Sequence, residues 1–390
     1  MPHNPPPSSH PPLHLYLHIP FCQRICAYCD FARVAAHTHW HAPYINALIA
    51  ELHHTLPLLP TRAIASLYIG GGSPSFLPAS LLTQLLHAVT TAFSLLPSAE
   101  ISVECNPHQV TTDWAHTLIA AGVNRFSLGV QSLNDHELHI LGRLHSAESA
   151  RRAFSILRAA PCPNISVDLM YGLPDQTEAS WHATIHTIAD DWQPEHVSLY
   201  ALQLQHNTPL ARLRQRHPAN FTWPDDDRIM DWYWHALDYL AARGYQHYEL
   251  SNTARPGRAC RHNIAYWDSR QFYLGLGAAA HSYCTLAPYT APRRFRNLTS
   301  IPAYCARVET GQRWRIFSPP LSARARLGEE IYLALRRTTG FVPRPEHLQL
   351  FAHIIRRQLD AGLLLTLPNG ALALSRRGIE LANAVMSDYV

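Results

Sequence analysis

Hydrophobic and polar positions alternate in residues 13–18, Leu-His-Leu-Tyr-Leu-His, which is the period-two pattern of a β-strand. Similar strand-like runs recur along the first part of the chain, at 64–69, 100–104, 124–128, 165–170 and 196–202. Helix-patterned segments follow these runs, at 44–54, 80–93, 112–121, 147–160, 178–190 and 226–243. Strands that alternate with helices indicate βα units and a parallel sheet. Because six units are too few for an eight-stranded barrel, we predict an α/β fold built on a partial, open (β/α)6 barrel.

The pattern changes after about residue 318. Helical segments at 323–337 and 345–361 precede two strand-like runs at 363–367 and 371–374, and a helix at 376–386 ends the chain. The Asn369-Gly370 pair between the two runs is a strong hairpin signal. Helices combined with one hairpin predict a small winged-helix-like α+β domain. Such folds often bind DNA, but no basic face stands out here, so we expect no nucleic-acid partner.

These patterns divide the chain into four parts. We predict a disordered tail at 1–12, the barrel at 13–245, a connecting segment at 246–317 and the small C-terminal domain at 318–390. The net charge of +4 is too small to argue for nucleic acid. No run approaches eighteen apolar residues, so we expect no transmembrane segment. The polar, proline-rich start lacks signal-peptide character, and we expect a cytoplasmic protein.

Cysteine spacing carries the first chemical signal. Five of the eight cysteines stand alone, whereas Cys22, Cys26 and Cys29 fall within eight residues. Thiolates are ligands of iron–sulfur clusters and of zinc, and these spacings place three sulfurs on one tight loop. From the residues alone, two interpretations remain: an iron–sulfur cluster, or a structural zinc ion with a histidine as fourth ligand. The histidines considered for that fourth position are His18, His37 and His39.

The C-x3-C-x2-C run resembles the signature of the radical S-adenosylmethionine (SAM) superfamily. This resemblance implies that Cys22, Cys26 and Cys29 hold a [4Fe–4S] cluster whose fourth iron is left open. Exchangeable SAM would chelate that iron through its amino and carboxylate groups. An electron from the cluster would then cleave SAM to methionine and a 5′-deoxyadenosyl radical, while the protein positions the cofactors.

Polar and glycine residues follow successive predicted strands. Gly70-Gly71-Gly72 comes after the second strand, where a bare backbone can approach a ligand closely, although a plain tight turn would use the same residues. Glu104 ends the third strand, where its carboxylate could bond ribose hydroxyls or cap the next helix. In parallel α/β barrels, functional residues gather at the carboxyl ends of strands. We therefore interpret these positions as a ligand site.

The resemblance narrows to the HemN/HemW group over nearly the whole chain. It rests on Tyr16-Leu-His-Ile-Pro-Phe-Cys22, the triple glycine, Glu104-x-Asn-Pro, Arg125-Phe-Ser-Leu-Gly-Val-Gln-Ser132, Leu141-Gly-Arg-Leu-His145 and Asp168-Leu-Met-Tyr-Gly-Leu-Pro174. That group holds oxygen-independent coproporphyrinogen III oxidases and haem chaperones. The resemblance implies SAM contacts at Tyr16, Gly72, Ser73, Glu104, Gln131, Arg143 and Asp168. The family usually has threonine at the position of Ser73, and serine keeps the hydroxyl.

Two features resemble the chaperone branch. Phe31 stands where the oxidases carry a further cysteine, and only 21 residues precede Cys22, whereas the oxidases have a longer segment. The chaperones also carry an H-N-x-x-Y-W motif, which matches the run from His262 to Trp267. Imidazole is a common axial haem ligand, so we predict a haem contact at His262, with Cys260 as the alternative ligand. A buried loop anchor is the competing interpretation of the motif.

The sequence thus predicts a radical SAM-type haem chaperone that binds haem and transfers it to an unidentified acceptor protein, with a low-potential electron donor as a further partner. The first alternative is an oxygen-independent coproporphyrinogen III oxidase. The second is a zinc-stapled α/β binding protein. Whether the chain is an enzyme stays open at this point, and no catalytic residue is assigned.

Overall fold

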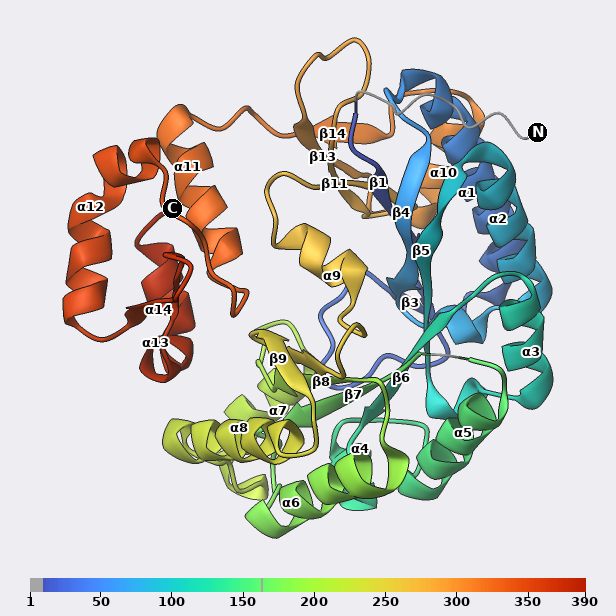
Figure 1. Ribbon diagram of the computed structural model, residues 1–390. Coiled ribbons are helices and arrows are strands. Elements are labelled where there is room, and N and C mark those ends of the chain that lie inside the picture. Colours follow the sequence, from blue (N-terminus) through green and yellow to red (C-terminus); the bar gives the residue numbers. More distant parts are fainter. Residues whose placement is uncertain (1–9, 163) are drawn as a thin grey trace.

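The computed structural model describes residues 10–162 and 164–390 (Figure 1), so most of the tail predicted at 1–12 lies outside the described residues. Six parallel strands form the predicted partial barrel, and the α/β fold class is confirmed. They are β1 (Leu13–Ile19), β4 (Ala63–Gly71), β5 (Ser94–Cys105), β6 (Arg125–Gln131), β7 (Ile165–Tyr171) and β8 (His196–Ala201). Each contains or overlaps one of the predicted strands.

Helices cover the outer face of this sheet (Figure 1). Those predicted are α1 (His41–Thr55), α2 (Ala79–Ala92), α3 (Thr112–Ala120), α5 (Ala147–Ala159), α6 (Glu178–His186) and α8 (Asp226–Ala241). The predicted helix at 178–190 continues beyond α6 as a π-helical turn, Thr187–Trp192. Two short helices were not predicted, α4 (Asp135–Ile140) and α7 (Pro209–Arg216). Both begin at a polar N-cap, Asn134 and Thr208, whose side chain accepts backbone N–H bonds.

The sheet extends well beyond the barrel, to twelve strands. At one edge, β11 (Phe272–Leu276) runs parallel to β1 and is followed by antiparallel β12 (His281–Cys284), β13 (Arg293–Asn297) and β14 (Arg315–Phe317). At the other edge lie β10 (Asn252–Ala254) and β9 (Gln246–Glu249). All six belong to the segment 246–317, which we expected to be a connector. These strands are short, and β13 reads Arg-Arg-Phe-Arg-Asn, so the strand pattern is weak.

The two ends of the barrel are closed differently. After β1, the cysteine loop passes through β2 (Phe21–Cys22) and β3 (Val34–Ala35) at the carboxyl end. The short helix α9 (Arg261–Tyr266) lies inside the curve of the sheet (Figure 1) and bonds residues near the amino ends of the strands. Along β1, the leucines pack in the main hydrophobic core, while His14 and Tyr16 make polar and ring contacts to residues of α9, β4 and β11.

The C-terminal residues form a second hydrophobic cluster, which includes Ile331, Phe351 and Met386. Its elements are α11 (Ala323–Ala334), α12 (Pro345–Asp360), β15 (Leu364–Thr366), β16 (Leu372–Leu374), α13 (Arg376–Glu380) and α14 (Ala382–Ser387), and α10 (Ile301–Glu309) precedes them. The Asn369-Gly370 turn joins β15 to β16 as predicted. The winged-helix likeness stays a prediction. Within residues 10–162 and 164–390, no helix is both long and apolar enough to cross a membrane.

Candidate functional site

The loop that carries the three cysteines is fixed at both ends and in its middle. Cys22 lies in β2, paired with β3, and its carbonyl accepts the N–H of Ala36 at 2.9 Å. The N–H of Ala27 donates to the carbonyl of Leu141 at 2.9 Å, and Arg24 donates to that of Gly142 at 2.7 Å. These bonds to the main chain hold the loop over the carboxyl end of the barrel.

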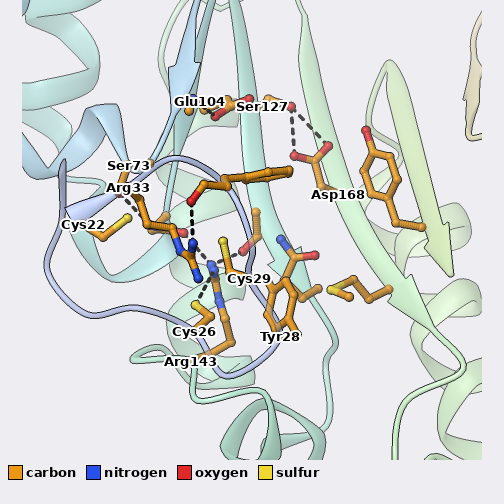
Figure 2. Close-up of a pocket in the computed structure, with 18 of the residues that line it drawn as sticks. Cys22, Cys26, Tyr28, Cys29, Arg33, Ser73, Glu104, Ser127, Arg143 and Asp168 are labelled. Carbon is orange, nitrogen blue, oxygen red and sulfur yellow. Dashed lines mark hydrogen bonds between the residues drawn. The ribbon is translucent and has the colours of Figure 1, made fainter. Parts of the chain in front are cut away.

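The three thiols are free, half-buried and line one cavity of about 330 Å³ (Figure 2). Burial, followed by the neighbouring Cys29 and Cys26, raises the pKa of Cys22 to about 12. Among the described residues, no three histidine, cysteine or acidic side chains converge on one metal ion. A tetrahedral zinc site requires such convergence, whereas each cysteine of a [4Fe–4S] cluster binds a different iron. Three free thiols on one loop, lining one cavity, are a donor set that suits a [4Fe–4S] cluster.

His18, one candidate for a fourth zinc ligand, is already occupied. Its Nδ1 lies 2.9 Å from the Tyr16 hydroxyl, and its Nε2 lies 2.8 Å from the carbonyl of Ala32. The other two candidates, His37 and His39, pack against each other with ring centroids 5.6 Å apart. None of the three completes a metal-binding group with the cysteines.

The triple glycine packs tightly against the start of the cysteine loop. A Cβ on Gly72 would lie 2.8 Å from the carbonyl carbon of Pro20 and 2.9 Å from the carbonyl oxygen of Phe21, both backbone atoms at the start of the cysteine loop. Gly71 has φ of +117°, a conformation that other residues rarely adopt. The turn therefore needs glycine to pack against the chain, and the contact of Gly72 with SAM stays a prediction.

Glu104 projects from the end of β5 into the same cavity. Its carboxylate accepts the hydroxyl of Tyr68 and the N–H of Gly71, each at 3.0 Å. Burial, together with nearby Asp168, raises the pKa of Glu104 to about 7, against the lowering effect of these two bonds and of Arg125. A carboxylate has about four acceptor positions, so two remain for hydroxyl groups of a ligand.

Arg143 links the cysteine loop to the end of β6. Its Nη2 donates to Asn106 Oδ1 at 2.5 Å and to the carbonyl of Gly129 at 2.7 Å, while Nη1 lies 3.6 Å from Cys26 Sγ (Figure 2). A guanidinium has five N–H donors in a fixed plane, so Arg143 is held rigidly beside one of the cysteines. Its positive charge would offset the negative charge of thiolates in the loop.

The other predicted SAM residues are also brought together. Asp168 on β7 accepts the Ser127 hydroxyl at 3.0 Å, and burial raises the pKa of its carboxyl group. Ser73 is only 2% exposed; its hydroxyl donates to Gln109 and accepts from Asn106 at 2.6 Å. Gly72, Ser73, Glu104, Gln131, Arg143 and Asp168 all line the cavity of the three cysteines, whereas Tyr16 lines an adjoining cavity.

Sequence reasoning missed several residues of this site. Tyr68, Asn106 and Ser127 also line the cavity and hold Glu104, Arg143 and Asp168 in place. The signal for Asn106 was present, because it belongs to the strand-end run that begins at Glu104. Tyr68 and Ser127 lie within strands and carry no motif signal of their own.

The structure does not favour the predicted haem contact at His262. This side chain is 1% exposed, and both ring nitrogens are engaged: Nδ1 lies 2.8 Å from Ser66 Oγ and Nε2 lies 2.9 Å from the Tyr266 hydroxyl. The alternative ligand, Cys260, is fully buried, with its thiol 3.4 Å from a carboxylate oxygen of Glu100. His262 and Cys260 therefore have partners inside the barrel, whereas Asn263 and Tyr266 of the same segment line cavities, and a haem contact at His262 stays a prediction.

Comparison with known proteins places the chain. The family described as the Radical SAM superfamily matches residues 16–188. The heme chaperone HemW of Lactococcus lactis is 33% identical over 382 residues, which cover 96% of each chain. The chain belongs to the HemW family. The Escherichia coli HemW is 37% identical over 276 residues, covering 70% of this chain and 71% of its own.

The relationship extends to animals and to a solved fold. A relative in Danio rerio, named radical S-adenosyl methionine domain-containing protein 1, mitochondrial, is 32% identical over 95% of this chain and 85% of its own. The structure of the Escherichia coli coproporphyrinogen III oxidase HemN covers 97% of this chain and 90% of that one, with a TM-score of 0.82 and 23% identity. At this identity the likeness shows the fold alone.

Proposed function

We propose that this HemW-family chain is a haem chaperone, which binds haem and transfers it to an acceptor protein. We also propose that Cys22, Cys26 and Cys29 hold a [4Fe–4S] cluster beside a SAM site. The observation that carries the second proposal is that the three free thiols line one cavity together with Glu104, Arg143 and Asp168. The relatives named as heme chaperones over 96% of the chain support the first.

Each polar group in the cavity has a definite role in this proposal. When bound, the reduced cluster and SAM supply one-electron cleavage of the sulfonium. Glu104, oriented by Tyr68 and Gly71, accepts hydrogen bonds from the ribose hydroxyls of SAM. Arg143 balances the charge of the thiolates from its position beside Cys26.

An oxygen-independent coproporphyrinogen III oxidase is the competing function, and one residue argues against it. Phe31 takes the place of a cysteine that the oxidases carry, and its side chain is 65% exposed. An exposed aromatic ring at the mouth of a cavity suits contact with a flat apolar cargo. It cannot supply the thiol found there in the oxidases.

The experiment that separates these functions uses the anaerobically reconstituted protein with a low-potential reductant and SAM. Coproporphyrinogen III is added, and the products are separated by chromatography and identified by mass spectrometry. We expect no sustained conversion to protoporphyrinogen IX, and saturable haem binding by the same preparation. Steady SAM-dependent production of protoporphyrinogen IX would make the chain an oxidase and overturn the proposed function.

A further inference from the structure

A second cavity, of about 660 Å³, adjoins the cavity of the cysteines. The two share Phe31, Gly71 and Glu104 in their walls. The second cavity is otherwise lined by Tyr16, His18, Ala32, Tyr266, Tyr273, Ala279, Ala280, His281, Arg296 and Thr299. Its volume is in the range of small-molecule and cofactor sites, and its walls combine aromatic rings with few charges, as such sites do.

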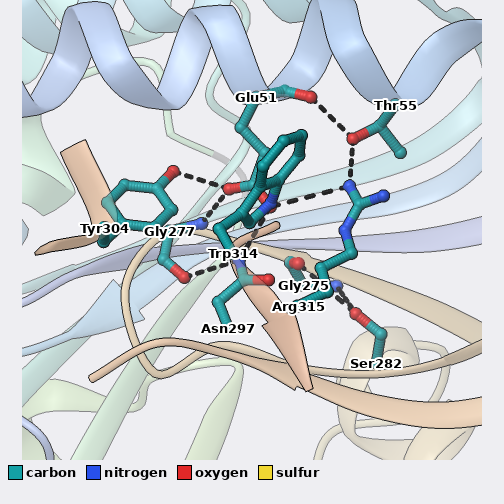
Figure 3. A network of polar contacts seen from close by, with 9 residues as sticks. All are labelled: Glu51, Thr55, Gly275, Gly277, Ser282, Asn297, Tyr304, Trp314 and Arg315. Atoms are coloured by element: carbon teal, nitrogen blue, oxygen red, sulfur yellow. Dashed lines mark hydrogen bonds and ion pairs between the residues drawn. The ribbon is translucent and has the colours of Figure 1, made fainter. Parts of the chain in front are cut away.

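The rim of this cavity includes the turn between β11 and β12, which a buried network holds in place (Figure 3). The carboxylate of Glu51 accepts the N–H of Gly277 at 2.8 Å and the Asn297 amide at 2.7 Å. Asn297 in turn donates to the carbonyl of Gly277 at 2.8 Å. Ala279 has φ of +62°, and such strain persists only where surrounding contacts determine the backbone, commonly at functional sites. The turn is therefore a rigid support.

This support presents His281, the first residue of β12, at the cavity. The imidazole is exposed, and neither ring nitrogen makes a hydrogen bond within residues 10–162 and 164–390. Arg296 faces it directly across the β12–β13 pair, and among the same described residues its guanidinium makes no ion pair. Partial burial lowers the pKa of His281, and the positive charges of Arg296 and Arg294 lower it as well. The lowered pKa favours the neutral imidazole, which is the form that binds a metal ion.

We propose that haem occupies this second cavity, with a ring nitrogen of His281 as the axial ligand of the iron. The proposal rests on the haem-carrying function proposed above and names its site. Phe31 contacts the macrocycle at the boundary with the cluster cavity, and Arg296 pairs with a propionate. The cargo therefore lies beside the cluster and SAM, with Tyr266 of α9 in the wall of its cavity.

The test is a haemin titration of the anaerobically reconstituted protein, followed by absorption in the Soret region. The variants are His281→Ala, Arg296→Gln and His116→Ala, the last being a matched control on an exposed histidine of α3. We expect His281→Ala to weaken haem binding by about tenfold or more and to shift the Soret band. Added imidazole should restore the wild-type band, and iron and sulfide content should not change.

Arg296→Gln should weaken haem binding without shifting the Soret band, because it removes a propionate contact and not a ligand. His116→Ala should match the wild type. If the wild type saturates with haem and His281→Ala binds it with the same affinity and spectrum, the site is wrong and the chaperone function stands. If the wild-type protein itself does not bind haem, the proposed function fails, and this site with it.

Discussion

The two ends of the barrel use the same residue types in opposite ways. At the carboxyl end, Cys22, Cys26, Cys29 and His281 face cavities and have free thiol or imidazole groups. At the amino end, Cys260 and His262 are buried, and their polar atoms bond to Glu100, Ser66 and Tyr266. The identity of a residue is therefore a weaker guide to ligand binding than whether its polar atoms already have partners.

This difference follows the general division of labour in parallel α/β barrels. Side chains at the carboxyl ends of strands bind ligands, whereas those at the amino ends stabilise the fold. Here α9 closes the amino end, and Glu100 accepts the backbone N–H groups of Arg261 and His262 at its first turn. In three dimensions His262 of the H-N-x-x-Y-W run is held by buried hydrogen bonds, whereas Asn263 and Tyr266 line the two cavities.

The largest expected effect compares cysteines at the two ends. Cys22→Ala, Cys26→Ala and Cys29→Ala should each abolish the cluster, because each removes the ligand of one iron, whereas Cys260→Ala should keep about four irons and four sulfides per chain. Iron and acid-labile sulfide analysis after anaerobic reconstitution, together with absorbance near 400 nm, measures this. A full cluster in all three loop variants would break the comparison, as would its loss in Cys260→Ala.

The second largest expected effect is a loss of stability when Glu51, at the centre of the buried network beneath the β11–β12 turn, is replaced. Glu51 is fully buried and bonds Gly277, Asn297, Tyr304 and Trp314. Glu51→Ala leaves these donors unpaired beside Arg315, so the free energy of unfolding should fall by about 3–5 kcal/mol. Chemical denaturation measures the change.

The matched control for Glu51 is Glu309→Ala, which removes an exposed carboxylate on α10 and should change the free energy of unfolding by less than about 0.5 kcal/mol. Equal stabilities of the Glu51 and Glu309 variants would show that the buried network contributes little to holding the turn.

A smaller effect compares the two histidines. His262→Ala leaves the Tyr266 hydroxyl without its hydrogen-bond partner and Ser66 with His14 alone, which should lower the free energy of unfolding by about 1–3 kcal/mol without altering the haem spectrum. His281→Ala should leave stability within about 0.5 kcal/mol of the wild type, because the side chain is exposed. Denaturation and haem spectra of both variants provide the measurements. A stable His262 variant with an altered haem spectrum would reverse the roles assigned to the two residues.

The smallest effect is a pH dependence at Glu104. Its pKa of about 7 in the folded protein exceeds the unfolded value, about 4.3, so the folded state binds more protons between these values. The resulting stability is present below the unfolded pKa and is lost as the pH rises through 7. Without SAM, the wild type should lose on the order of 1 kcal/mol relative to Glu104→Gln between pH 6 and pH 8. If the free energies of unfolding of the wild type and Glu104→Gln changed equally between pH 6 and pH 8, the raised pKa of Glu104 would be contradicted.

The barrel could be predicted because its strands carry strong alternation or long apolar runs, and because helices separate them. Strands β9–β14 were not predicted because they are only three to five residues long. In addition, β9, β13 and β14 contain charged side chains, which weaken the strand pattern. His281 was not predicted as a site residue either. It lies at the second cavity only because β11 pairs in parallel with β1, and the sequence did not predict this pairing. The motifs of the cysteine loop and strand ends did locate the candidate SAM cavity.

The sequence could not show the surroundings of Gly72 and His262. The missing Cβ of Gly72 leaves room for the backbone of Pro20 and Phe21, a contact that the triple glycine did not reveal. His262 suggested an iron ligand, but Ser66 on β4, almost 200 residues away in the chain, occupies one ring nitrogen. Such long-range partners have no signature in a single sequence.

Haem carriage by this chain is tested most directly by a haem titration of the wild-type protein with and without its reconstituted cluster. The two cavities share walls but use different residues for the cluster and for haem. Haem binding should therefore saturate near one haem per chain in both preparations, with a Soret band distinct from that of free haem. Absorbance that rises in proportion to added haem, without saturation and with the spectrum of free haem, would contradict the chaperone function.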